Sequence, residues 1–119
     1  MRDFRKLTVW NKAHILVIEV YKVTANFPKA ELYGLTSQIR RASVSIPANI
    51  SEGCGRESEA DFRRFLQISL GSAAELEYHF LLARDLHYMN ESDYDQLSNQ
   101  AIEIKRMLTR LIQKLKADG

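Results

Sequence analysis

Apolar side chains recur at alternating spacings of three and four residues over most of the chain, and this spacing is typical of helices that bury one face. The most regular row lies in the C-terminal quarter and contains Leu97, Ala101, Ile104, Leu108 and Leu111. The 119 residues include only two prolines and five glycines, too few for the turns of a small all-β domain. The sequence therefore predicts an all-α protein.

Four such rows predict four helices, over residues 8–27, 31–52, 58–88 and 92–116. The connections between them are short, and short connections favour neighbouring helices that run in opposite directions. A chain of this length typically forms one core. We therefore expect a single domain, residues 1–119, folded as an antiparallel up-and-down four-helix bundle.

Residues near the predicted helix ends indicate how each helix starts and stops. Ser58 and Ser92 are each followed three residues later by Asp, an arrangement that resembles a capping box at a helix N-terminus. Pro47 lies inside the second helix and predicts a kink rather than a stop. Gly53 is expected to end that helix in the left-handed conformation.

The apolar arcs of the first and third helices are wider than one partner layer needs. Trp10, Val17 and Tyr21 form a second row beside the main row of the first helix. The second half of the third helix carries further apolar residues on its remaining sides: Tyr78, Leu81, Leu82 and Leu86. A single bundle cannot cover both helices completely, so the pattern predicts a homo-oligomer.

The sequence lacks the residues that are characteristic of several classes of function. The single cysteine, Cys54, excludes an intrachain disulfide, favours a reducing compartment, and has no catalytic base that the sequence places beside it. The Glu-x-x-His spacing of di-metal bundles does not occur around His79. The sequence also shows neither a membrane-spanning nor a signal-peptide stretch. We expect a cytoplasmic protein that is not an enzyme, has no membrane partner, and uses no metal or cofactor.

Basic side chains gather at both ends of the sequence. Residues 1–30 contain six Lys and Arg against two acidic residues, and the last helix places Arg106, Arg110 and Lys114 at successive spacings of four on its outward face. This stripe predicts binding to nucleic-acid phosphates, and the alternative is an ordinary solvated helix exterior. The complete candidate set is Arg5, Lys6, Lys12, Lys105, Arg106, Arg110 and Lys114.

A polar row runs along the second helix beside its apolar row and contains Gln38, Arg41, Ser45, Asn49 and Glu52. One interpretation is a solvated helix face. The other is a buried polar network or subunit contact, in which an arginine of this helix pairs with a carboxylate of the third. The candidates for that pair are Arg40 or Arg41 and Glu75 or Glu77. Both interpretations predict a structural rather than a catalytic role.

Four stretches are less ordinary than the amphipathic pattern around them: Val9–Ala13, Gln38–Ala42, Ser45–Gly53 and Gly71–Glu77. They resemble a family of four-helix-bundle proteins named for intervening sequences in bacterial 23S ribosomal RNA genes, and the part from Gln38 through Gly53 is the most specific. The resemblance implies a compact bundle that assembles as a ring-like homopentamer. A related branch, the accessory variability determinant of diversity-generating retroelements, is a basic pentamer that binds nucleic acid and a reverse transcriptase.

Two hypotheses about function follow from the basic stripe and the resemblance. The first is a non-enzymatic, homo-oligomeric bundle that binds structured RNA or another nucleic acid through the last helix and the N-terminal segment. The second is a protein-interaction adaptor, in which the oligomer displays its helix surfaces to a protein partner without binding nucleic acid. Salt dependence separates them, because phosphate binding weakens as ionic strength rises.

Overall fold

The computed structural model describes residues 2–118 and contains four long helices: α1 (Thr8–Thr24), α2 (Leu35–Cys54), α3 (Glu59–Asp85) and α4 (Glu91–Asp118). Two short 3-10 helices, η1 (Phe4–Lys6) and η2 (Lys29–Glu31), precede α1 and α2. Residues 2–118 contain no strand. The prediction of an all-α protein with four helices is confirmed.

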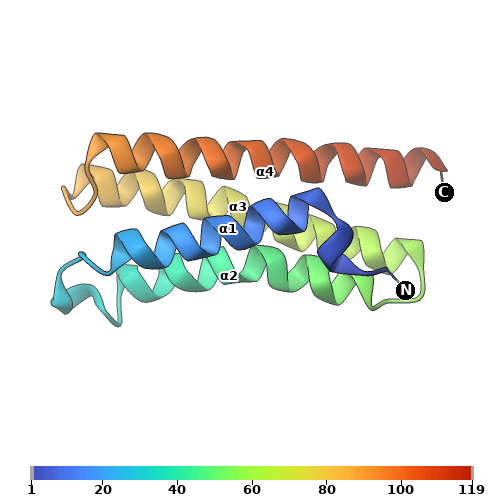
Figure 1. Ribbon diagram of the computed structural model, residues 1–119, viewed down its shortest axis with the longest axis horizontal. Coiled ribbons are helices and arrows are strands. Elements are labelled where there is room, and N and C mark those ends of the chain that lie inside the picture. Colours follow the sequence, from blue (N-terminus) through green and yellow to red (C-terminus); the bar gives the residue numbers. More distant parts are fainter. Residues whose placement is uncertain (1, 119) are drawn as a thin grey trace.

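The four helices lie side by side in an elongated molecule of 45 × 22 × 19 Å (Figure 1). α2 packs against α3, α3 packs against α4, and α1 lies against both α2 and α4. Both chain termini and the turn between α2 and α3 lie at the same end of the molecule, on the right of Figure 1. We call this the terminal end, and the opposite end, with the other two connections, the distal end.

The core forms from the apolar rows that the sequence displays. Leu16, Ile46, Phe80 and Leu108, one from each long helix, are fully buried. α2 and α3 approach each other closely: a Cβ added at Gly53 would lie 2.9 Å from the Cβ of Phe65. Glycine is required there because a side chain would push the two helices apart.

The connections shorten three helices relative to the predicted bounds. α1 ends at Thr24 rather than at Phe27. α2 begins at Leu35 rather than at residue 31, because Lys29–Glu31 form η2 instead. The Glu31 carboxylate accepts a hydrogen bond from the Leu35 N–H (3.1 Å) at the start of α2. α3 ends at Asp85, three residues before its predicted end.

The predicted caps have different outcomes. Ser58 caps α3 as expected, since its hydroxyl accepts a hydrogen bond from the Asp61 N–H (3.0 Å). The prediction for Ser92 is wrong: the Asn90 side chain accepts the Asp93 N–H at 2.7 Å, because α4 begins one residue before Ser92.

The expected left-handed glycine at the end of α2 is also wrong. Gly53 lies inside α2, which continues through Pro47 to Cys54, and no described glycine has a positive φ. Gly55, which follows α2, has a right-handed helical conformation. The left-handed conformation occurs instead at His87 (φ 63°), in the turn after α3. The reversal of the chain after α3 therefore depends on a non-glycine residue, which the sequence pattern did not indicate.

Candidate nucleic-acid interface

Three cations of the predicted set form an exposed stripe on the outer face of α4. Arg106, Arg110 and Lys114 are each separated by one turn of helix, and each is exposed. None of the three has an acidic partner within 4.0 Å among residues 2–117. Beside the stripe, Ile102 and Thr109 help to line a shallow depression of about 370 Å³. These positive charges are therefore available to an anion from solvent.

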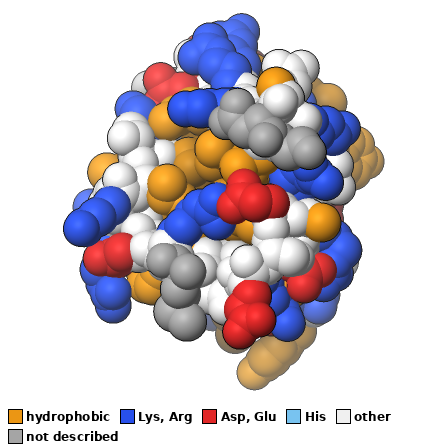
Figure 2. All heavy atoms as spheres, turned by 90° about the vertical axis from the view of Figure 1, so that its right-hand side faces the viewer, with side chains coloured by type: hydrophobic (Ala, Val, Ile, Leu, Met, Phe, Trp, Pro, Cys, Tyr) orange, Lys and Arg blue, Asp and Glu red, His pale blue; other side chains and the backbone are white. Residues whose placement is uncertain are grey.

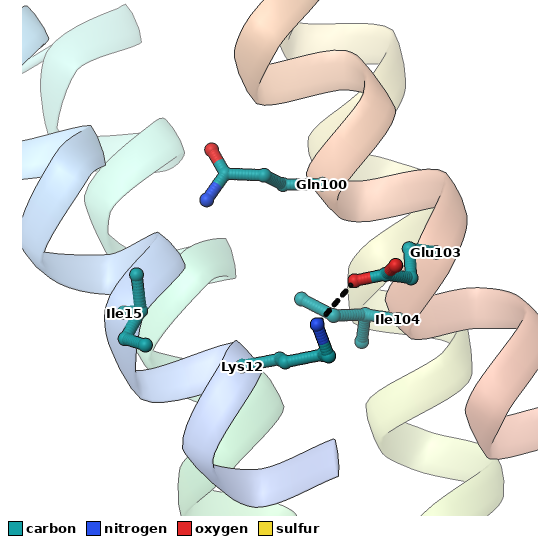
Figure 3. A pocket seen from close by; sticks show the side chains of 5 residues that line it. All are labelled: Lys12, Ile15, Gln100, Glu103 and Ile104. Atoms are coloured by element: carbon teal, nitrogen blue, oxygen red, sulfur yellow. Dashed lines mark ion pairs between the residues drawn. The ribbon is translucent and has the colours of Figure 1, made fainter. Parts of the chain in front are cut away.

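Two other predicted cations are already neutralised by carboxylates of neighbouring helices. Lys12 of α1 points toward Glu103 of α4, with 2.9 Å between Nζ and Oε1 (Figure 3). Lys105 of α4 forms an ion pair with Glu77 of α3 at 2.6 Å. A phosphate that approaches either lysine must compete with a carboxylate. The structure thus separates the predicted set into paired and unpaired cations.

The remaining two predicted cations belong to η1, which folds back over α1 and α2. The Arg5 side chain is 72% exposed and lies over the Phe4 ring, with its Nη1 3.7 Å from the Asp3 carboxylate. Lys6 is exposed and has no ion-pair partner within residues 2–118. The N-terminal segment therefore adds two accessible cations to the terminal end.

The charges of the chain divide unequally between the two halves of the molecule. The terminal half, residues 2–16, 45–72 and 105–118, contains twelve Lys and Arg but only six Asp and Glu. The distal half, residues 17–44 and 73–104, contains five Lys and Arg and nine Asp and Glu. Figure 2, which faces the terminal end, shows Lys and Arg at several places around its outline and fewer acidic side chains. The net charge of +2 is therefore the sum of six excess positive charges in the terminal half and four excess negative charges in the distal half.

The polar row of α2 is buried in part and solvated in part. The Ser45 hydroxyl is 2.8 Å from the Ser72 hydroxyl of α3, and the Asn49 amide donates to the Ser45 carbonyl at 2.8 Å and to its hydroxyl at 2.9 Å. Gln38, Arg41 and Glu52 are exposed. Each of the two interpretations of this row therefore applies to some of its residues.

The predicted pairing of an α2 arginine with an α3 carboxylate is wrong for the described residues. Arg40 faces α1, where its Nε donates to the Thr24 hydroxyl at 2.9 Å and its guanidinium lies over the Tyr21 ring. Arg41 is exposed. On α3, Glu77 faces α4, and Glu75 lies 3.7 Å from His79 on its own helix. Arg41 and Glu75 line the same depression of about 250 Å³ without an ion pair within 4.0 Å, whereas Arg40 and Glu77 point toward other helices.

The described residues form neither an exposed thiol, nor a metal-binding cluster, nor a membrane-spanning helix. Cys54 is buried, and its removal from water raises the pKa of its thiol. Residues 2–118 contain no cluster of three or more His, Cys, Asp or Glu that could hold a metal ion. None of the described helices is long and apolar enough to span a lipid bilayer.

A surface of exposed apolar residues crosses α1, the α1–α2 connection and α2. Tyr21 is 44% exposed, Tyr33 is 94% exposed, and both help to line a groove of about 480 Å³ together with Leu32 and Val44. The polar side chains of Ser37, Arg40 and Arg41 complete the lining. Of the residues expected to remain outside the bundle, Tyr21, Tyr78 and Leu86 are exposed. The others are half-buried: Trp10, Val17, Leu81 and Leu82. The sequence pattern missed Leu32, Tyr33 and Val44, because the first two lie in a connection and the third lies outside the apolar row of α2.

The architecture defines an all-helical protein of four long helices, and the comparisons assign it to a family. Residues 5–110 match the family described as 23S rRNA-intervening sequence protein, and the chain belongs to this family. It is similar to the crystal structure of a protein with unknown function from the S23 ribosomal protein family of Bacteroides thetaiotaomicron. That similarity has a TM-score of 0.80 and 30% sequence identity, and it covers 88% of this chain and 98% of the other. A search among curated proteins found no match.

Proposed function

We propose that the protein is a non-enzymatic, homo-oligomeric bundle that binds RNA or another nucleic acid through its terminal end. The observation that supports this best is the excess of six positive charges in the terminal half, where Arg106, Arg110 and Lys114 form no ion pair with residues 2–117. Spaced cations on a helix face bind backbone phosphates and do not read bases. The proposed binding is therefore strong at low salt and tolerant of sequence.

The proposed assembly is a ring-like homopentamer of antiparallel up-and-down bundles in the cytoplasm. The shared position of the two termini in Figure 1 supports the up-and-down course of the chain. The exposed groove lined by Tyr21, Leu32, Tyr33 and Val44 supports assembly, because apolar surface of this kind marks protein contacts. A cyclic assembly repeats each terminal end around one rim and multiplies the positive charge there.

Salt titration with a fluorescently labelled RNA tests the binding. Raising the salt from about 50 to about 200 mM is expected to weaken binding at least about tenfold, because at least three phosphate contacts release their counterions. The measurement is fluorescence anisotropy at each salt concentration. Undetectable binding at the lowest salt would refute the nucleic-acid function.

Light scattering after gel filtration tests the assembly. A mass of five times 13.7 kDa is expected for the wild-type chain. Val44→Glu places a charge in the groove and is expected to lower the mass, whereas Lys29→Glu, at an exposed position outside the groove lining, is the matched control. A monomeric mass for the wild type at micromolar concentration would overturn the oligomer.

The adaptor function remains the second candidate, and the same groove favours it. If the oligomer is an adaptor, it binds no RNA even at low salt. The salt titration above therefore distinguishes the two functions without knowledge of the partner.

A further inference from the structure

Aromatic rings cluster on the N-terminal segment, inside the basic terminal end. The Phe4 ring lies 4.8 Å from the Trp10 ring at an angle of 56°, and Trp10 stacks on His14 at 5.1 Å with the rings 8° from parallel. His14 is exposed, whereas Phe4 and Trp10 are half-buried. The sequence did not indicate this cluster, because Phe4 meets Trp10 only after η1 folds back onto α1.

An open pocket of about 490 Å³ lies against this cluster and has Phe4 as its aromatic wall. Arg2, Asp3 and Arg5 bring charged groups to its lining, which is completed by Ser51 of α2 and by Gly55, the residue after α2. Pockets of roughly 300 to 1,000 Å³ accommodate small planar ligands. An aromatic wall with hydrogen-bonding groups at its margin is the combination that receives an unstacked nucleobase.

Arg5, which lines the pocket, and Lys6, which follows it in the sequence, suit the phosphates that accompany such a base. Arg5 is 72% exposed and contacts Asp3 only at 3.7 Å, so its guanidinium can leave the Phe4 ring at little cost. An exposed cation–π contact is weaker than the stacking of a base on an aromatic ring. A base can therefore replace Arg5 over Phe4, while Arg5 and the exposed Lys6 turn to the flanking phosphates.

We infer that this pocket binds one nucleotide of a single-stranded nucleic acid, with the base stacked on Phe4 and the phosphates held by Arg5 and Lys6. The inference rests on the proposed nucleic-acid function and specifies its substrate as a single strand. A duplex keeps its bases stacked on one another and cannot place one in the pocket. The α4 stripe supplies general attraction, whereas the Phe4 pocket supplies the preference for unpaired bases.

The test compares Phe4 variants in the full-length oligomer with several anionic probes. Phe4→Leu is expected to weaken the binding of oligouridylate at least about fivefold, because it removes a stacking ring but keeps an apolar side chain. Phe4→Tyr restores a ring and is expected to bind as the wild type does. Tyr78→Leu is the matched control, since it removes an exposed aromatic ring from the distal half. Fluorescence anisotropy measures the affinity of each variant.

Inorganic polyphosphate separates stacking from loss of the fold, because it carries phosphates without bases. Its affinity is expected to be the same for the wild type and for Phe4→Leu. Trp10 is the only tryptophan and lies beside Phe4, so its emission is expected to change with oligouridylate and not with polyphosphate. Oligothymidylate in place of oligouridylate shows whether the single strand is RNA, DNA or either, and any of these agrees with the inference.

Three results would overturn the inference while the proposed function stands. The first is an unchanged affinity of Phe4→Leu for oligouridylate. The second is an equal affinity of the wild type for a short RNA duplex and for the single strand. The third is that free uridine monophosphate competes as well as unlabelled oligouridylate does. Failure of every polyanion to bind the wild type would instead refute the proposed function itself.

Discussion

The two ends of the molecule are closed by groups of opposite charge. At the terminal end, Arg2 ties the N-terminal segment down: its N–H donates to the Cys54 carbonyl at 3.0 Å, and its guanidinium pairs with Glu59 and lies over the Phe62 ring. At the distal end the carboxylate of Glu31 connects neighbouring segments in the same way. Glu31 accepts hydrogen bonds from the Leu35 N–H at 3.1 Å and from the Tyr88 hydroxyl at 3.0 Å.

The comparison shows that the charged residues that hold the ends of the bundle together differ from the charged residues that are exposed to solvent. Arg2 is used for closure, whereas Arg106, Arg110 and Lys114 of α4 are exposed and form no ion pair with residues 2–117. At the distal end the exposed charges that remain are mostly acidic. A polyanion is therefore attracted to one end and repelled from the other, which orients its approach. Changes to the α4 cations are expected to alter binding without altering the fold.

The largest expected effect comes from reversing the stripe at the terminal end. Replacement of Arg106, Arg110 and Lys114 by Glu removes the terminal excess of six positive charges, because each change lowers the charge by two. Affinity for labelled RNA at low salt is expected to fall at least about a hundredfold, and the salt dependence to weaken by about three contacts. Anisotropy measures both, and circular dichroism checks that helicity is retained.

A variant with the same total charge, changed in the distal half, is the control. Lys22, Lys29, Gln96 and Asn99 are exposed and lie outside the groove lining, and their replacement by Glu gives the same net charge as the first variant. RNA affinity is expected to fall much less. An equal loss in the two variants would show that net charge, and not the terminal end, controls binding.

A second prediction concerns the packing that holds the terminal end together. In Gly53→Ala the new Cβ meets Phe65 at 2.9 Å and Phe62 at 3.1 Å, so the free energy of unfolding is expected to fall by about 1–3 kcal/mol. Gly71 lies inside α3 with no atom within 4 Å of an added Cβ. Gly71→Ala is therefore expected to stabilise by about 0.5–1 kcal/mol. Urea unfolding measures both, and a stabilised Gly53→Ala would contradict the close approach of α2 and α3.

The sequence predicts well what depends on one helix alone. The apolar rows place the core, and the spacing of Arg106, Arg110 and Lys114 places the stripe, because both follow from the period of a helix. Contacts between helices also depend on how each helix is rotated, and the period does not give this. For that reason the pair of Lys12 with Glu103 was not predicted, and the arginine pairs of α2 were predicted wrongly.

The Phe4 cluster and the exposed groove lie further beyond sequence reasoning. Phe4 precedes every apolar row, and Tyr33 lies in a connection, so neither belongs to a periodic pattern. Their environments arise when η1 and the α1–α2 connection fold back onto the helices. The elements of the fold were thus predictable, but the site that gives the terminal end its proposed preference was not.

The third prediction tests the carboxylate that closes the distal end. The hydrogen bond from its hydroxyl to Glu31 raises the pKa of Tyr88 above the ordinary tyrosine value of 10.0. A folded-state pKa raised in this way gives stability that is fully present below pH 10 and is lost as the pH rises through the folded value. Glu31→Gln removes the charge, so Tyr88 is expected to ionise closer to pH 10 and the alkaline fall in stability to become shallower.

Tyrosinate absorbance during an alkaline titration measures the Tyr88 ionisation, and thermal unfolding at each pH measures stability. Tyr88→Phe is the control, since it should remove one late-titrating tyrosine from the absorbance curve. If Glu31→Gln leaves that late step in place, the hydrogen bond from Tyr88 to Glu31 does not set its pKa.

The smallest expected effect comes from releasing a paired cation at the boundary of the two halves. Lys12 and Glu103 are both about half-exposed, so their ion pair contributes at most about 1 kcal/mol to folding. Glu103→Gln frees Lys12 for a phosphate and is expected to tighten RNA binding about twofold and to steepen the salt dependence by about one contact. Glu91→Gln removes an equal charge at the distal end, where no phosphate is expected, and should leave both quantities nearly unchanged. If Glu103→Gln and Glu91→Gln change RNA affinity equally, the total charge of the protein determines affinity and the release of Lys12 from its ion pair does not.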